Sequence, residues 1–136
     1  MSTVQIDHFF TRGNAWKPGV LELYTLDTDG ITRVSLPVSA FATDISCTVR
    51  KKPAVAQPDD TDSDVVGRIT LVPSAHGVIT VVGPDQLQLL FHGAKTKTWN
   101  TQNEYFYEVK GTLLEDGEPY SPVKGRLVTT WSANQT

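Results

Sequence analysis

The run DDTDSD at residues 59–64 comes closest, in residue types and spacing, to a metal site. Asp60, Asp62 and Asp64 occupy the first, third and fifth positions of an EF-hand loop, and carboxylate oxygens are the ligands that Ca²⁺ prefers. An EF-hand then needs a glycine and a bidentate glutamate, where this sequence has Val65 and Leu71. We therefore reject an EF-hand. A looser calcium site and a solvated acidic loop are the two interpretations left open.

Other side chains that could carry catalysis are scattered. The three histidines lie far apart in the sequence, at His8, His76 and His92. Cys47 is the only cysteine, so no thiolate zinc cluster and no disulfide within the chain can form, and its alternating apolar context predicts a core residue. Glu104 and Glu108 are four residues apart on one predicted strand, too far apart for an acid–base pair.

Motifs of catalysis and phosphate binding are missing from the sequence. It contains no G-x-S-x-G, no Gly-rich phosphate loop and no H-E-x-x-H. We therefore expect that the chain is not an enzyme and that it requires no cofactor and no metal.

Residues 1–19 hold the best candidates for partner binding. Phe9, Phe10 and Trp16 are large aromatic residues in an irregular-looking segment, and Arg12 and Lys17 flank them. Aromatic residues and arginine are enriched at interface hot spots. We interpret residues 1–19 as an N-terminal arm or irregular segment that contacts partners. The alternative is that Phe10 and Trp16 cap one end of the folded domain.

Composition restricts the classes of protein. The chain has 136 residues, 39% of them hydrophobic, and a net charge of −3 with both signs interspersed. This fits one domain with its own core, and it lacks the clustered basic face of a nucleic-acid-binding protein. No apolar run is long enough for a membrane span, and the N-terminus lacks the pattern of a secretion signal. We expect folding in a reducing cytoplasm.

Hydrophobic residues alternate with period two along most of the chain, which predicts strands. The predicted strands cover residues 20–26, 31–37, 43–51, 67–73, 77–83, 104–114 and 124–131, with a further alternating stretch from Val4 to Phe10. Residues 67–83 are a candidate hairpin, and residues 84–90 fit a helix or a short strand. About eight strands predict an all-β protein, a single antiparallel β-sandwich of immunoglobulin-like or jelly-roll type. It spans residues 20–136 and carries a long acidic loop at 51–66.

The stretch EYFYEVKGTLLEDGEPY, residues 104–120, combines alternation with a turn. Tyr105, Tyr107 and Val109 share one strand face, and Asp116-Gly117 interrupts the pattern. An Asp-Gly pair between alternating runs is typical of a hairpin, because glycine accepts a positive φ. We predict a core hairpin over residues 104–131 with this aromatic face buried.

Aromatic residues also suggest another class of function. Trp16, Trp99, Trp131 and the four tyrosines could form a platform on which sugars stack. A carbohydrate-binding module is therefore the alternative to a protein-binding structural role.

The order of motifs resembles that of a known group. Two segments follow one another in the chain, GRITLVPSAHGVITVVGPDQLQLL and YFYEVKGTLLEDGEPYSPVKGRLVTTW. Over residues 30–131 the chain resembles the small β-sandwich modules of tailed-phage virions, such as the N-terminal domains of baseplate upper proteins. It departs from them in residues 1–30, in Trp99–Asn103 and at Thr129. The matching residues are Val49-Arg50, Gly67-Arg68-Ile69, Tyr105, Tyr107, Val109, Asp116-Gly117, Gly125 and Leu127.

The resemblance implies a non-enzymatic structural virion protein without catalysis or cofactor. For a small chain without a fibre or coiled coil we favour a capsid decoration, or cement, protein that stabilises the shell. Its expected partners are the major capsid protein or another virion protein and further copies of itself, with no nucleic acid and no membrane. A baseplate or tail accessory protein is the alternative within this class. The expected location is the virion, after synthesis in the host cytoplasm.

Overall fold

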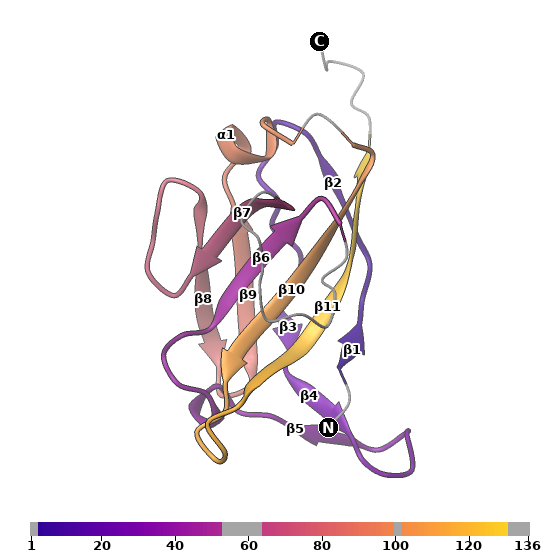
Figure 1. Cartoon of the computed structure of the whole chain (residues 1–136), viewed down its shortest axis with the longest axis vertical. Helices are drawn as coiled ribbons and strands as arrows, with labels where there is room; N and C mark the ends of the chain where they lie inside the picture. The colour runs from indigo at the N-terminus through magenta and orange to yellow at the C-terminus, as the bar shows by residue number, and fades with distance from the viewer. Residues whose placement is uncertain (1–2, 53–63, 100–101, 131–136) are drawn as a thin grey trace.

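The computed structural model describes residues 3–52, 64–99 and 102–130 (Figure 1). Strands account for 54% of the structure, so the all-β prediction is confirmed. A single sandwich of about eight strands is not confirmed, because the described residues form eleven strands in three sheets. The strands are β1 (Val4–Gln5), β2 (His8–Thr11), β3 (Leu21–Glu22), β4 (Tyr24–Leu26), β5 (Arg33–Ser35), β6 (Ser46–Arg50), β7 (Val65–Thr70), β8 (Gly77–Gly83), β9 (Gln86–Phe91), β10 (Glu104–Thr112) and β11 (Pro119–Thr130).

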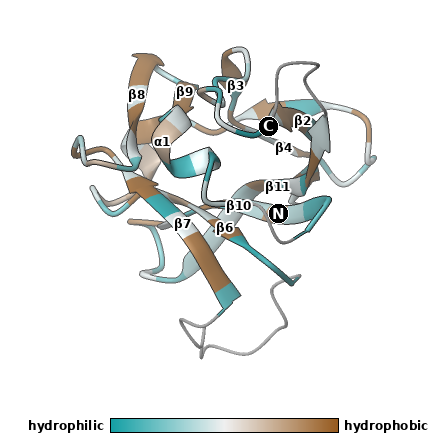
Figure 2. Cartoon of the chain, turned by 90° about the horizontal axis from the view of Figure 1, so that it is seen from above, coloured by the Kyte–Doolittle hydropathy of each residue, from teal (hydrophilic) through white to brown (hydrophobic). Residues whose placement is uncertain are grey.

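The largest sheet has six strands in the order β1-β11-β10-β6-β7, with β2 also paired to β11. A three-stranded sheet has the order β3-β9-β8, and β4 and β5 form a separate two-stranded sheet. Figure 2 shows β8, β9 and β3 on one side of the molecule and β7, β6, β10 and β11 on the other. Short helical turns are the 3₁₀ helix Val38–Ala40 and α1 (Gly93–Thr96).

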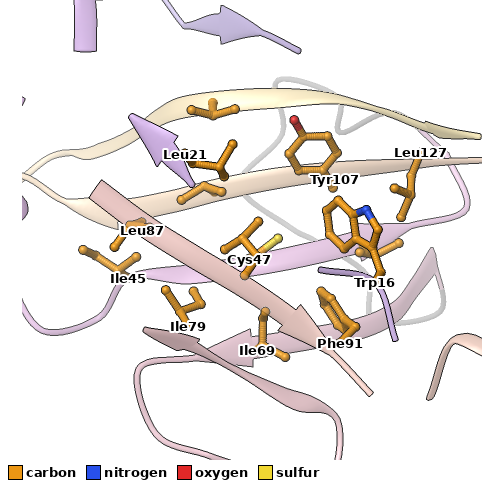
Figure 3. Close-up of a cluster of buried hydrophobic side chains, with 14 of the residues drawn as sticks. Trp16, Leu21, Ile45, Cys47, Ile69, Ile79, Leu87, Phe91, Tyr107 and Leu127 are labelled. Atoms are coloured by element: carbon orange, nitrogen blue, oxygen red, sulfur yellow. The ribbon is translucent and has the colours of Figure 1, made fainter. Parts of the chain in front are cut away.

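The core fills the space between the two larger sheets. Ile79, Leu87 and Phe91 reach into it from the three-stranded sheet, and Cys47 and Tyr107 from the six-stranded sheet (Figure 3). All five side chains are at most 2% exposed. Strand alternation explains this arrangement, because every second residue of a strand points to the same face.

The N-terminal residues correct the expectation of an irregular arm. β1 and β2 both run parallel to β11 and keep one register, with Val4 opposite Val123 and His8 opposite Leu127. The sheet is therefore not wholly antiparallel, and residues 4–11 belong to it. The alternation seen from Val4 to Phe10 already indicated a strand, but it could not show which strand would accept it.

The predicted hairpin around Asp116-Gly117 is confirmed. β10 and β11 pair antiparallel from Glu104–Val128 to Thr112–Pro119, and Gly117 has φ +70°. The exposed fractions of Tyr105, Tyr107 and Val109 are 0%, 2% and 1%, so the aromatic face is buried as predicted.

The predicted hairpin over residues 67–83 is wrong. β7 pairs with β6 in the six-stranded sheet, whereas β8 pairs with β9 in the three-stranded sheet, so the connection between them crosses from one layer to the other. The segment expected to be a helix or a short strand is strand β9. Leu87, Leu89 and Phe91 alternate towards the core, which is the period of a strand.

Most of the acidic loop predicted at 51–66 lies outside the described residues, as do Asp60, Asp62 and Trp131. The described ends of this segment meet, since the amide of Lys51 donates a hydrogen bond of 2.8 Å to the carbonyl of Asp64.

Candidate partner-binding surface

The five predicted partner-binding residues separate into a buried pair and a more accessible set. Phe10 and Trp16 are each only 3% exposed. Phe10 packs edge-to-face on Trp99 with ring centroids 5.4 Å apart, and Trp16 stacks on Phe91 at 5.9 Å. The prediction that Phe10 and Trp16 bind partners is therefore wrong, because both side chains are part of the hydrophobic core.

Phe9 is the most exposed of the aromatic residues in this segment. Its side chain is 67% exposed because strand alternation turns it away from the face that carries Phe10. Lys17 is exposed, and Arg12 is half-buried. Phe9 and Lys17 both line a shallow groove of about 260 Å³ between β2 and the segment that follows it. The accessible part of the predicted site is therefore centred on Phe9 and Lys17.

The segment between Phe9 and Lys17 is held by hydrogen bonds to other parts of the chain. The buried hydroxyl of Thr96 accepts a hydrogen bond of 3.0 Å from the amide of Gly13 and donates one of 2.7 Å to the carbonyl of Asn14. Backbone hydrogen bonds of 2.9 and 3.0 Å join Trp16 to Phe91. These hydrogen bonds fix the backbone between Phe9 and Lys17. Nothing in the sequence around Thr96 indicated this role.

Arg126 organises a polar network on the solvent face of the six-stranded sheet, beside Phe9. Its amide and its guanidinium donate to the carboxylate of Asp7 at 2.9 and 3.1 Å, and Glu104 lies 3.8 Å from the guanidinium. The hydrogen bonds from Arg126 hold the pKa of Asp7 below its usual value. Val128, opposite Phe9 in the parallel pair, is half-buried on the same face.

Two shallow hollows continue across this face. One of about 250 Å³ is lined by Phe106, Lys124 and Arg126, and one of about 360 Å³ is lined by Asp44, Arg68 and Lys110, among others. Both signs of charge meet there. Such a surface suits contact with another protein that offers complementary charges around apolar side chains.

His8 and Cys47 are the described residues closest to catalytic chemistry. The His8 ring packs against both Trp16 and Tyr107, with ring centroids 5.9 and 5.6 Å away, and burial lowers the pKa of His8 while Asp7 opposes that shift. Burial raises the pKa of the Cys47 thiol, which is fully enclosed and therefore unsuited to act as a nucleophile. Among residues 3–52, 64–99 and 102–130, no group of three His, Cys, Asp or Glu side chains could hold a metal ion.

Two of the three tryptophans considered for sugar stacking are buried in the core. Trp16 and Trp99 are 3% and 1% exposed, and the indole of Trp99 donates a hydrogen bond of 3.2 Å to the carbonyl of Val66. Both faces of such a ring are committed to the core, so neither offers a stacking platform. Trp131 lies outside the described residues.

Within the described ranges, no helix has the length and apolar character needed to cross a membrane. No protein-family model matches this chain, and no curated protein matches its sequence.

Proposed function

We propose that this chain is a non-enzymatic structural virion protein of a tailed phage, and that it acts as a capsid decoration protein. The resemblance of residues 30–131 to β-sandwich modules of such virions supports the proposal, and the all-β fold is compatible with it. In this proposal the two larger sheets are the two layers of the sandwich. The partners are the major capsid protein and further copies of the chain.

Exposure of Phe9 is the observation that carries the protein-binding part of the proposal. A phenylalanine that is 67% exposed beside an exposed lysine is the kind of residue that becomes a hot spot when a partner covers it. The hydrogen bonds of Thr96 and Trp16 already order the segment that follows Phe9. Binding would therefore cost little conformational entropy, which favours affinity.

Cementing a capsid requires many copies and a modest contact for each. An interface of about 1,600 Å² is sufficient for a stable protein contact. When each subunit bridges two capsomers, many weak contacts act together against the forces that expand the shell. The mixed charges around Arg126 and Arg68 would fix the orientation of the subunit rather than supply most of the affinity.

The test is cosedimentation with phage capsids that lack this protein. We expect Phe9→Ala and Lys17→Ala to leave the fold intact and to weaken capsid binding. Ile31→Ala is the matched control, since Ile31 is 82% exposed on the separate β4–β5 hairpin. Capsid binding by Phe9→Ala that equals that of the wild type would refute the proposed contact. Antibody labelling that marks the tail instead of the shell would refute the decoration role.

A further inference from the structure

Among the strands of the described residues, β8 pairs with β9 alone and so forms an edge of the three-stranded sheet. Figure 2 shows it at the margin of the molecule, with a largely hydrophobic colour. Its sequence, GVITVVG, contains neither a charged residue nor a proline. Those are the residues with which proteins normally protect an edge from pairing. Of the other edge strands of the two larger sheets, β7 carries Arg68 and β3 carries Glu22, whereas β1 is uncharged but only two residues long.

The sequence of β8 is nearly symmetric about Thr80. From either end it reads glycine, valine, a β-branched aliphatic residue and then Thr80. If two such strands pair antiparallel around a two-fold axis at Thr80, Gly77 lies opposite Gly83 and Ile79 lies opposite Val81 of the other copy. Every pair then matches in size and polarity, which is the requirement for an interface that uses the same surface twice.

Neither β8 nor its partner strand β9 carries a charged residue. Thr80 is exposed, and Val81 and Val82 are each 45% exposed. Between Gly77 and Phe91 the only charged residue is Asp85, in the turn between β8 and β9. Pairing along β8 therefore buries no charged side chain of β8 or β9, which would be costly if unpaired.

We infer that two copies of this chain pair through β8, antiparallel about Thr80, and join their three-stranded sheets into one continuous six-stranded sheet. A second copy fits better than a foreign strand because the near-palindrome matches itself residue by residue. Pairing β8 with β8 also leaves no free β8 edge, so the assembly closes as a dimer. The inference specifies the homo-oligomer contained in the proposed function, and it uses a surface other than that of Phe9.

Pairing should be closest at the centre of the strand. The register of β8 against β9 shifts between Val81 and Gly83, and such a shift bends a strand locally. We therefore assign the central contacts to Ile79–Val81, with the two Thr80 side chains directly opposite one another. Residues opposite each other in an antiparallel pair have Cβ atoms about 5 Å apart, so like charges placed there repel.

Sedimentation equilibrium of the purified chain tests the inference. The wild type should have twice the monomer mass of 14.9 kDa. Thr80→Lys and Thr80→Asp should each sediment as monomers, and an equimolar mixture of the two should form dimers again because opposite charges then face each other. Ile31→Lys, which adds the same charge at a residue that is 82% exposed, should remain dimeric. Circular dichroism confirms that each variant is folded.

Several results would overturn the inference. A wild-type chain that is monomeric at every soluble concentration, or that forms open-ended polymers, excludes a closed β8 pair. Dimers of Thr80→Lys as tight as those of the wild type, or a mixture that stays monomeric, exclude pairing centred on Thr80. A monomeric mass of the wild type overturns the inference even if a variant fails to fold. A monomeric wild type that still binds capsids through Phe9 would refute this inference and leave the proposed function standing.

Discussion

The phenol of Tyr107 donates a hydrogen bond of 2.5 Å to the backbone carbonyl of Ile6. Tyr107 belongs to β10, and Ile6 lies between β1 and β2, on the other side of β11. The carbonyl passes directly over Gly125, the residue of β11 opposite Tyr107. This contact therefore ties the N-terminal strand to the centre of the six-stranded sheet.

Removing the Tyr107 hydroxyl should weaken this link without opening a cavity. We expect Tyr107→Phe to lower the free energy of unfolding by about 1–3 kcal/mol, because the part-buried carbonyl of Ile6 loses this partner. Tyr107→Ala should cost about 3–5 kcal/mol, as large aromatic truncations in cores do. Urea denaturation measures both. A cost for Tyr107→Ala below about 1 kcal/mol, the range of surface positions, would contradict the burial of this face.

Gly125 should tolerate no side chain. A Cβ atom there would lie 1.9 Å from the carbonyl oxygen of Ile6, so either the N-terminal strand or β11 must move. We expect Gly125→Ala to cost about 1–3 kcal/mol, as overpacking does. Gly19→Ala is the control, because a Cβ there meets nothing within 4 Å. Similar unfolding free energies for the two variants would show that the chain does not pass over Gly125.

The local parts of the fold could be predicted from the sequence. Alternation at Tyr105, Tyr107 and Val109 and the Asp116-Gly117 pair specify a hairpin, because its strands are neighbours in the chain and the turn sets their register. The parallel partner of residues 4–11 could not be predicted. It lies more than a hundred residues away on β11, and no local pattern encodes such a contact. Gly125 was noticed as a motif residue, but its close contact with Ile6 requires coordinates.

The burial of two of the candidate site residues could not be predicted for a related reason. Phe9, Phe10 and Trp16 were all predicted to bind partners, because the sequence alone cannot distinguish an aromatic core residue from an aromatic interface residue. The strand phase of β2 decides between Phe9 and Phe10, and the backbone pairing of Trp16 with Phe91 places its ring inside. Local sequence also could not show the pairing of residues 67–83. Its two strands are joined by a short connection, yet β7 pairs with β6 in one sheet and β8 pairs with β9 in another.

Adjacent residues Phe9 and Phe10 should differ sharply in their effect on stability. We expect Phe10→Ala to cost about 3–5 kcal/mol, because its ring packs on Trp99 and Tyr105 in the core. Phe9→Ala should stay within about 0.5 kcal/mol of the wild type. Deletion of residues 1–16 should abolish cooperative unfolding, because it removes β1, β2 and the core residues Phe10 and Trp16. A truncated chain that melts like the wild type would restore the arm interpretation.

Thr96 should be needed for its hydroxyl and not for its shape. Thr96→Val keeps the size of the side chain but leaves the amide of Gly13 and the carbonyl of Asn14 without their partner. We expect a loss of about 1–3 kcal/mol in thermal or urea unfolding. Thr96→Ser retains the hydroxyl and should lose less. Equal losses for the two variants would indicate that packing of the methyl group, rather than hydrogen bonding, holds the segment.

Protonation of His8 should oppose folding. Its ring is half-buried against Trp16 and Tyr107, and burial lowers its pKa below 6.5, with Asp7 acting in the opposite direction. Below pH 6.5 the unfolded chain therefore binds more protons at His8 than the folded chain does. The contribution of His8 to stability is complete above pH 6.5, and it declines as the pH falls towards the lowered pKa of the folded state. Urea midpoints measured from pH 8 to pH 5, about the range in which histidines titrate, should show this decline. His8→Gln should flatten it, because glutamine does not titrate. A slope unchanged by His8→Gln would assign the effect to other groups.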